Sequence, residues 1–229
     1  MPRIQPTPAY SPSPIEEREV RVSPIGLEGT LTLPRDAKAI ILFAHGSGSS
    51  RHSPRNVFVA RELNHAGFGT FLFDLLTERE SRDRRNVFDI DLLADRLVMA
   101  TAWMAESEAA ARLPIGYFGA STGVAAALVA AVRSPREISA IVSRGGRPDL
   151  AGAALAKVRS PTLLIVGGQD VEVLELNRRA LAELSCVKAL NIVPGATHLF
   201  PERGALEDVV QMARTWFVEH LPTDTRKTV

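Results

Sequence analysis

The sequence predicts an α/β fold in which helices cover both faces of a mostly parallel, doubly wound sheet. Six short, nearly continuous apolar runs indicate strands buried on both faces, at residues 39–44, 70–73, 115–118, 140–142, 162–166 and 189–193. Five longer segments with helical periodicity alternate with them, at residues 55–66, 90–111, 122–132, 172–184 and 206–220. Such alternation places the carboxyl ends of the strands along one edge, where ligands bind.

The segment before these strands predicts an antiparallel addition to the sheet. Residues 19–23 and 29–33 alternate apolar and polar side chains, and Pro24-Ile25-Gly26 separates them. This alternation is typical of strands with one face in water, so the two segments predict a hairpin at a sheet edge.

Length and composition favour one globular domain. The 229 residues, of which 45% are hydrophobic, can bury one large core more readily than two small ones. Residues 1–15 are rich in proline and serine and predict a disordered arm. The domain is expected to span residues 16–221, and residues 222–229 form a polar tail.

The charge and the cysteine content restrict the partners and the compartment. A formal net charge of +1 provides no general field that would attract nucleic acid or an anionic membrane. The single cysteine, Cys186, cannot form an internal disulfide and is expected to pack in apolar surroundings. The N-terminus lacks the apolar segment of a signal peptide, and the apolar run 124–132 is too short to span a membrane. We therefore expect a soluble cytoplasmic protein.

A strand, a sharp turn and a helix are predicted around Ser121. Gly119-Ala120-Ser121-Thr122-Gly123 has the G-x-S-x-G spacing of a nucleophile elbow, in which small neighbours let the serine stand above the sheet. The same residues could also serve only as a turn. Partners for the serine at the same sheet edge decide between the two interpretations.

Two later strands supply such partners. Asp170 follows the strand at 162–166, and His198 follows the strand at 189–193. Because a hydroxyl is a poor nucleophile at neutral pH, a histidine must take its proton and a carboxylate must orient that histidine. The order Ser121, Asp170, His198 along the chain is that of α/β-hydrolases. Asp149 and Glu172 remain alternatives for the acid.

The loop after the first parallel strand predicts a second part of the site. His45-Gly46-Ser47-Gly48 lets backbone N–H groups approach a developing oxyanion, with Ser47 as the first choice of donor and Gly48 as the second. Thr122 is expected to supply the other N–H group. His45 is expected to organise the loop through hydrogen bonds. A phosphate-binding loop is the alternative, but neither G-x-x-x-x-G-K-[ST] nor G-x-G-x-x-G occurs here.

Four motifs together resemble the α/β-hydrolase superfamily: His45-Gly46, Gly119–Gly123, Gly168-Gln169-Asp170 and Gly195–His198. The resemblance covers residues 16–221. Within the superfamily the chain resembles the dienelactone hydrolase-like esterases, including hydrolase modules that can be joined to phosphoribosyltransferases. The resemblance implies an α/β-hydrolase fold without a cap domain, since only residues 143–160 separate two strands where relatives carry a cap.

The resemblance also implies a reaction. Dienelactone hydrolase itself has a cysteine at the elbow, whereas this chain has Ser121, so a plain carboxylic-ester hydrolase without a metal or cofactor is expected. A small-molecule ester would be its substrate. An acyltransferase or thioesterase would share the same residues, and a non-catalytic binding protein on the same fold is a further alternative.

Arginines on the loops at the same edge predict substrate binding through charge. Arg51 and Arg55 follow the His45 loop, and Arg144 and Arg147 follow the strand at 140–142. A guanidinium fits a carboxylate or phosphate through two hydrogen bonds. In the alternative interpretation these arginines pair with acidic side chains of the protein and order the loops, with Asp149, Glu78 and Glu80 as the candidates.

Overall fold

The computed structural model describes residues 15–107 and 110–222. The predicted disordered arm therefore lies outside the described residues up to residue 14, and the polar tail does so from residue 223. The first strand begins at Ile15, within the range predicted as the arm.

Eight strands form one sheet in the order β1-β2-β4-β3-β5-β6-β7-β8. Their bounds are β1 Ile15–Val22, β2 Leu27–Pro34, β3 Ile40–Ala44, β4 Gly69–Phe73, β5 Ile115–Ala120, β6 Ile138–Arg144, β7 Thr162–Gly167 and β8 Lys188–Val193. The helices are α1 Pro54–His65, α2 Glu78–Ser81, α3 Arg84–Val87, α4 Ile90–Glu106, α5 Gly123–Arg133, α6 Val171–Glu183 and α7 Ala205–His220, with the 3-10 segment η1 Pro148–Lys157.

The strand pairing confirms the predicted sheet. β1 and β2 form an antiparallel hairpin in which Val22 lies opposite Leu27, and β2 also pairs antiparallel with β4. The pairs β4–β3, β3–β5, β5–β6, β6–β7 and β7–β8 are parallel. The carboxyl ends of these six strands consequently lie on one edge of the sheet.

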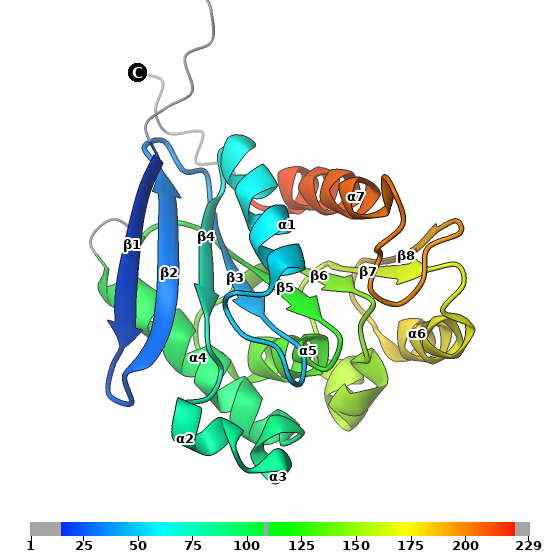
Figure 1. The fold of residues 1–229 in the computed structure, drawn as a ribbon, viewed down its shortest axis with the longest axis horizontal. Coiled ribbons are helices and arrows are strands. Elements are labelled where there is room, and N and C mark those ends of the chain that lie inside the picture. Colours follow the sequence, from blue (N-terminus) through cyan, green and yellow to red (C-terminus); the bar gives the residue numbers. More distant parts are fainter. Residues whose placement is uncertain (1–14, 108–109, 223–229) are drawn as a thin grey trace, which may run out of the picture.

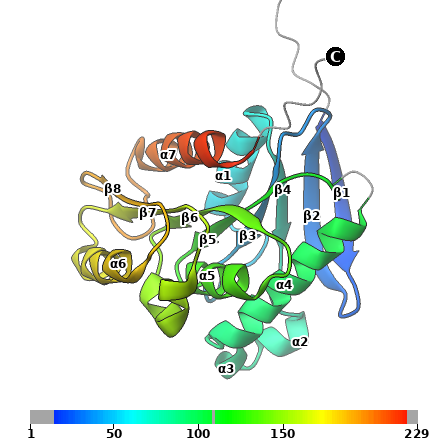
Figure 2. The same cartoon turned by 180° about the vertical axis from the view of Figure 1, so that it is seen from behind.

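Helices cover both faces of the sheet, as the continuous apolar runs predicted. α1 and α7 lie on one face, and α4, α5 and α6 lie on the other (Figures 1 and 2). Successive strand residues alternate between these layers: Leu42 and Tyr117 pack on the side of α4 and α5, whereas Phe43 and Phe118 pack on the side of α1 and α7. Each such fully buried side chain contributes roughly 1.5–3 kcal/mol by leaving water.

Some elements differ from the sequence prediction. α4 ends at Glu106 rather than near residue 111, because Ser107 is in an extended conformation. β8 is half exposed rather than covered on both faces, since it is an edge strand with β7 as its neighbour. The helical segments α2, α3 and η1 were not predicted. η1 occupies most of the 143–160 connection.

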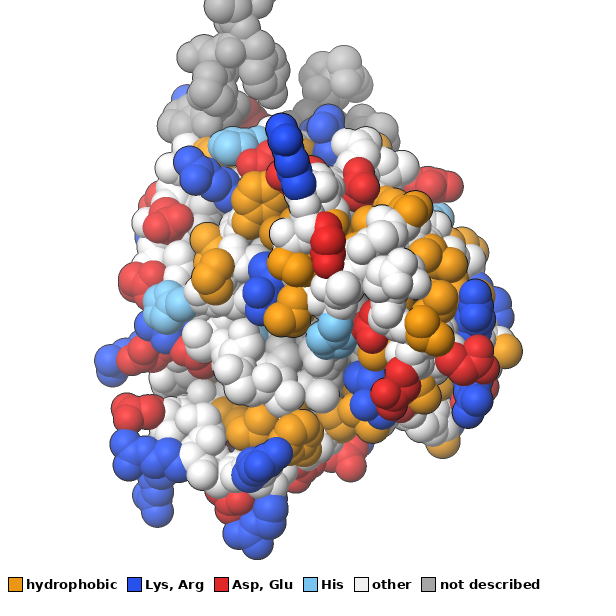
Figure 3. All heavy atoms as spheres, turned by 45° about the vertical axis from the view of Figure 1, so that its right-hand side comes forward, with side chains coloured by type: hydrophobic (Ala, Val, Ile, Leu, Met, Phe, Trp, Pro, Cys, Tyr) orange, Lys and Arg blue, Asp and Glu red, His pale blue; other side chains and the backbone are white. Residues whose placement is uncertain are grey.

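The surface shows mixed charge, as expected from the net charge. Basic and acidic side chains are interspersed over the face drawn in Figure 3, with apolar side chains between them. In the part of the chain that the structure describes, no helix is long and apolar enough to cross a membrane. Cys186 is a free, partly buried thiol that packs against the core.

Candidate active site

The turn at Ser121 has the geometry of a nucleophile elbow. Ser121 has a φ of +52°, a conformation that costs a residue with a side chain of the order of 1–3 kcal/mol. Both flanking glycines are required sterically. A Cβ at Gly119 would lie 2.4 Å from the Cα of Val124, and a Cβ at Gly123 would lie 2.1 Å from the carbonyl oxygen of Ala44. The small residues therefore let α5 start directly against β3 and β5.

The structure brings His198 and Asp170 together at the same edge. His198 Nδ1 lies 2.6 Å from Asp170 Oδ2, with the carboxylate side chain 15% exposed and the imidazole 39% exposed. Asp170 is the residue that precedes α6, and the loop of His198 passes close to the end of β7: a Cβ at Gly167 would meet the carbonyl oxygen of Ala196 at 2.4 Å. A carboxylate can only accept, so Nδ1 carries the proton and Nε2 keeps a lone pair.

Neither of the two alternative acids forms a hydrogen bond with His198 among the described residues: Glu172 is exposed, and Asp149 has a different partner. Both oxygens of Asp149 accept hydrogen bonds from Arg147, at 2.9 and 2.8 Å. This is the pairing that the alternative interpretation of Arg147 predicted. Asp149 is thereby engaged with a cation of its own loop, while Asp170 contacts the imidazole.

A turn after β6 lies between the serine and the histidine. Arg147 donates its backbone N–H to the Ser121 carbonyl at 3.0 Å. Gly145, with a φ of +52°, packs against the histidine, since a Cβ there would lie 3.0 Å from the carbonyl oxygen of His198. Among the described residues no hydrogen bond joins the Ser121 hydroxyl to His198. Such catalytic hydrogen bonds often tighten only when substrate is bound.

The His45 loop is tied to the elbow. The Ser47 N–H donates to Thr122 Oγ1 at 2.9 Å, so this predicted oxyanion donor already has a partner. The N–H groups of Thr122 and Gly48 have no hydrogen bond within residues 15–107 and 110–222. A Cβ at Gly46 would lie 2.8 Å from the Cβ of Ser121, which shows how closely the loop approaches the serine.

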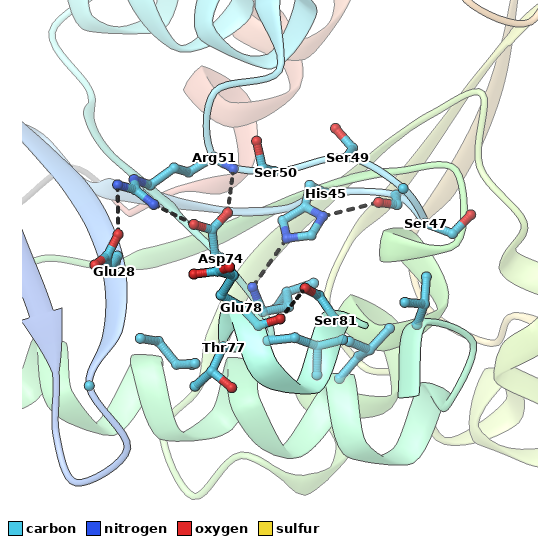
Figure 4. A pocket seen from close by; sticks show the side chains of 18 residues that line it. Glu28, His45, Ser47, Ser49, Ser50, Arg51, Asp74, Thr77, Glu78 and Ser81 are labelled. Carbon is cyan, nitrogen blue, oxygen red and sulfur yellow. Dashed lines mark hydrogen bonds and ion pairs between the residues drawn. The ribbon is translucent and has the colours of Figure 1, made fainter. Parts of the chain in front are cut away.

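His45 connects the ends of β3 and β4. Its Nδ1 lies 3.0 Å from the Gly46 carbonyl oxygen, and its Nε2 lies 3.1 Å from the N–H of Leu75 (Figure 4). The carbonyl oxygen must accept and the N–H must donate, so the ring is neutral with its proton on Nδ1. Burial lowers the pKa of His45, against the raising effects of the Gly46 carbonyl and Asp74.

This arrangement predicts how the stability depends on pH. Because the folded state lowers the pKa of His45 below about 6.5, the unfolded chain binds more protons as the solution is acidified. The contribution of His45 to the free energy of unfolding is complete above about pH 6.5 and decreases as the pH falls toward the lowered pKa. We expect His45→Gln to flatten this part of the stability profile, measured by urea unfolding between pH 5 and 8. The prediction is wrong if His45→Gln and the wild type have parallel profiles in that range.

A charged cluster lies beside the His45 loop. Arg51 donates its backbone N–H to Asp74 Oδ1 at 2.8 Å, and its guanidinium contacts Asp74 Oδ2 and, at 2.9 Å, Glu28 (Figure 4). These carboxylates raise the pKa of Arg51, although burial alone would lower it. Asp74 therefore holds the loop that follows β3 through its contacts with Arg51. Arg51 also pairs with protein carboxylates, but not with the predicted Glu78 or Glu80.

A cavity of about 560 Å³ opens next to this cluster. Its apolar lining comes from Leu27, Leu75, Leu76, Val87 and Leu93. The Glu28, Arg51 and Asp74 side chains and the His45–Ser50 loop form a polar part of the lining (Figure 4). The cavity thus combines an apolar side with a polar side and borders the loop that approaches Ser121.

The sequence analysis missed α2 and α3, whose residues form one wall of this cavity. Each has only four residues, too few to show a helical period. A signal was nevertheless present. Thr77 and Glu80 form a capping box at α2, and the Asp83 side chain caps α3. The spacing T-x-x-E marks a helix start even without an apolar stripe.

The remaining two candidate arginines, Arg55 and Arg144, lie at the start of α1 and at the end of β6. Arg144, at the end of β6, is only 6% exposed, and its Nη2 donates to Asn56 Oδ1 at 3.2 Å. Arg55 lies in the first turn of α1. Within the described residues neither guanidinium forms an ion pair with a carboxylate, in contrast to Arg51 and Arg147. Asn56, a partner that the sequence analysis did not identify, is buried.

No group of three or more His, Cys, Asp or Glu side chains that could hold a metal ion occurs in residues 15–107 and 110–222.

The sheet order and the elbow define the chain as an α/β-hydrolase. No family model matches the sequence. A dienelactone hydrolase from Anabaena variabilis has 51% sequence identity and a TM-score of 0.87 over 93% of this chain and all of its own. The chain therefore belongs to the dienelactone hydrolase family. Est1E from Butyrivibrio proteoclasticus shares the fold, with 16% identity and a TM-score of 0.73 over 89% of this chain and 98% of its own.

Two curated relatives are longer proteins. Each is a "Putative phosphoribosyl transferase" of Mycobacterium tuberculosis, from strains CDC 1551 and H37Rv, and is 56% identical over 215 residues. The match covers 93% of this chain and 48% of each relative. The chain thus spans about half the length of the curated relatives it matches. Taken together, the neighbours support an esterase-like hydrolase.

Proposed function

We propose that the protein hydrolyses carboxylic esters through an acyl-enzyme formed on Ser121. The observation that carries this proposal is the 2.6 Å contact between His198 and Asp170, at the sheet edge where the strained Ser121 turn also lies. Phosphoribosyl transfer is not assigned to this chain. That name belongs to proteins twice as long, whereas the relative named dienelactone hydrolase matches over its whole length.

The proposed reaction follows from the protonation of the histidine. With its Nδ1 proton held by Asp170, His198 has Nε2 free to accept the proton of the Ser121 hydroxyl as Oγ attacks the ester carbonyl. The imidazolium then gives this proton to the departing alcohol. A water molecule activated by the same Nε2 hydrolyses the acyl-enzyme and restores the serine.

Backbone N–H groups would stabilise the tetrahedral oxyanion. Thr122 N–H, which has no partner among the described residues, is one proposed donor. Ser47 remains the proposed second donor, and its N–H would exchange the Thr122 hydroxyl for the substrate oxygen. Gly48, with an N–H that is free in the described structure, is the alternative. One such donor contributes about 10²–10³-fold to turnover.

The cavity lined by α2 and α3 suits one side of a small ester. Its volume of about 560 Å³ and its apolar wall would accept a hydrocarbon or aromatic group. An acyltransferase or thioesterase would use the same site, and product analysis in the presence of competing alcohols distinguishes these reactions from hydrolysis.

Covalent labelling tests the proposal directly. We expect an alkyl fluorophosphonate to label the protein once, on Ser121, because the elbow alone combines an activated hydroxyl with oxyanion donors. Mass spectrometry of peptides would locate the label. Ser121→Ala should not be labelled, while Ser185→Ala, a change at an exposed serine remote from the edge, should be labelled at the wild-type rate. Labelling that persists in Ser121→Ala contradicts the proposal.

A further inference from the structure

Two arginines near the elbow, Arg55 and Arg144, form no ion pair with a carboxylate of residues 15–107 and 110–222. Arg144 is 6% exposed at the end of β6, and in the described structure its side chain contacts one polar group, the Asn56 amide. Burial, and to a lesser extent the nearby positive charge of Arg55, lowers the pKa of Arg144 to about 10. A buried charge beside a like charge is unfavourable unless an anion compensates it.

Several donors of this cluster have no acceptor among the described residues. Arg144 Nη2 is bonded to Asn56 Oδ1 and its Nε is enclosed, whereas Nη1 is neither bonded within the described chain nor enclosed. Asn56 Nδ2 is likewise neither bonded within the described chain nor enclosed. The two terminal nitrogens of Arg55 are also unbonded there and not enclosed. The Arg144–Asn56 hydrogen bond thus brings β6 and α1 together, and further donors of both elements remain without an acceptor among the described residues.

The start of α1 adds a third positive contribution. The helix has 12 residues, no side-chain cap and no acidic residue in its first turn. Its first backbone N–H groups, at Arg55 and Asn56, have no hydrogen bond with any described residue. Helix N-termini with free N–H groups favour anions, and phosphate in particular.

We propose that Arg55, Asn56 and Arg144, with the N-terminus of α1, bind a phosphate group on the ester substrate. This inference rests on the proposed function, and it names the substrate class as phosphorylated esters. The position fits such a substrate. Arg144 pairs in register with Ala120, and its carbonyl oxygen lies 3.3 Å from the Ser121 N–H, so the cluster is one strand away from the nucleophile.

The charge of the cluster favours a dianion. Two guanidinium groups and a helix N-terminus leave a net positive charge around a monoanionic carboxylate, whereas a phosphate monoester compensates both cations. A phosphate also has three terminal oxygens for the separate donors of Arg55, Asn56 and Arg144. A carboxylate has two, in one plane, and would leave part of the donors without an acceptor.

Titration calorimetry with inorganic phosphate tests the site apart from catalysis. The full chain carrying Ser121→Ala is used, because this variant cannot turn over. We expect phosphate to bind, and Arg144→Gln and Arg55→Gln each to weaken binding by about tenfold or more, since each removes a charge-assisted hydrogen bond. Arg61→Gln, a change at an exposed arginine of the same helix, should bind as the parent does.

The outcomes separate the two proposals. Absence of phosphate binding, equal binding by Arg55→Gln and its parent, or acetate binding as tight as phosphate would overturn the phosphate site. If Arg144→Gln does not fold, Arg55→Gln decides, because Arg55 is only partly buried. In the wild-type background, Arg55→Gln should raise the KM of a phosphorylated ester relative to that of its neutral analogue. Phosphate binding without hydrolysis of either ester would leave the site standing and contradict the esterase.

Discussion

Ser121→Ala is expected to lower kcat for a small carboxylic ester by about 10⁴–10⁶-fold, equivalent to roughly 5–8 kcal/mol of transition-state stabilisation. The change removes the proposed nucleophile but keeps the Cβ, so the turn at φ +52° is retained. Residual activity over the uncatalysed reaction would come from the oxyanion donors. Steady-state kinetics with purified protein measures the loss, and an unchanged melting temperature shows that the fold is intact.

His198→Ala provides the matching test of cooperation. We expect a loss of similar size, and we expect the double variant with Ser121→Ala to be hardly worse than either single variant. The reason is that serine and histidine act in one proton transfer. Once either residue is removed, removing the other decreases kcat little further. Losses that multiply in the double variant would show that the two residues act separately.

Asp170→Asn is expected to lower kcat by about 10⁴-fold while the protein stays folded. The carboxylate accepts from His198 Nδ1 at 2.6 Å, and an amide at this position can donate instead, which places the imidazole proton on Nε2. Nε2 could then no longer accept the serine proton. Asp170 also compensates the charge of the imidazolium that forms during the reaction. The substitution should therefore change kcat by a larger factor than it changes KM.

Asp149→Asn is the matched control. This carboxylate pairs with Arg147 instead of the histidine, so kcat should remain near the wild-type value. An inactive Asp149→Asn together with an active Asp170→Asn would transfer the role of the acid to Asp149.

Much of the fold follows from local pattern. The apolar run that became β3 and the helical segment that became α1 differ from their predicted bounds by one residue, because burial on both faces demands continuous apolar side chains. Where burial is partial the pattern is less informative. The strand at 189–193 was predicted as covered on both faces, but β8 is a partly exposed edge strand, and α2 and α3 are defined by caps instead of an apolar stripe.

The candidate site likewise has residues that the sequence predicts and contacts that it does not. Motif spacing predicted Ser121, Asp170 and His198 as the catalytic residues, and the structure brings the last two into contact. Pairings between distant segments were not predictable. Nothing in the sequence near Arg51 specifies Asp74 and Glu28 as its partners, and nothing near Arg144 specifies Asn56.

The sequence by itself determined the alternation of the parallel strands with the five longer helices, the elbow glycines and the loops that follow the strands. These depend on hydrophobic period and on backbone sterics, which act over a few neighbouring residues. The tertiary structure alone decided which ends meet. It placed Asp74 and Glu28 against Arg51, occupied the Ser47 N–H with the Thr122 hydroxyl and left Arg144 without a carboxylate partner among the described residues. Charges and hydrogen bonds depend on distances across the sheet, and the packing of the whole chain sets those distances.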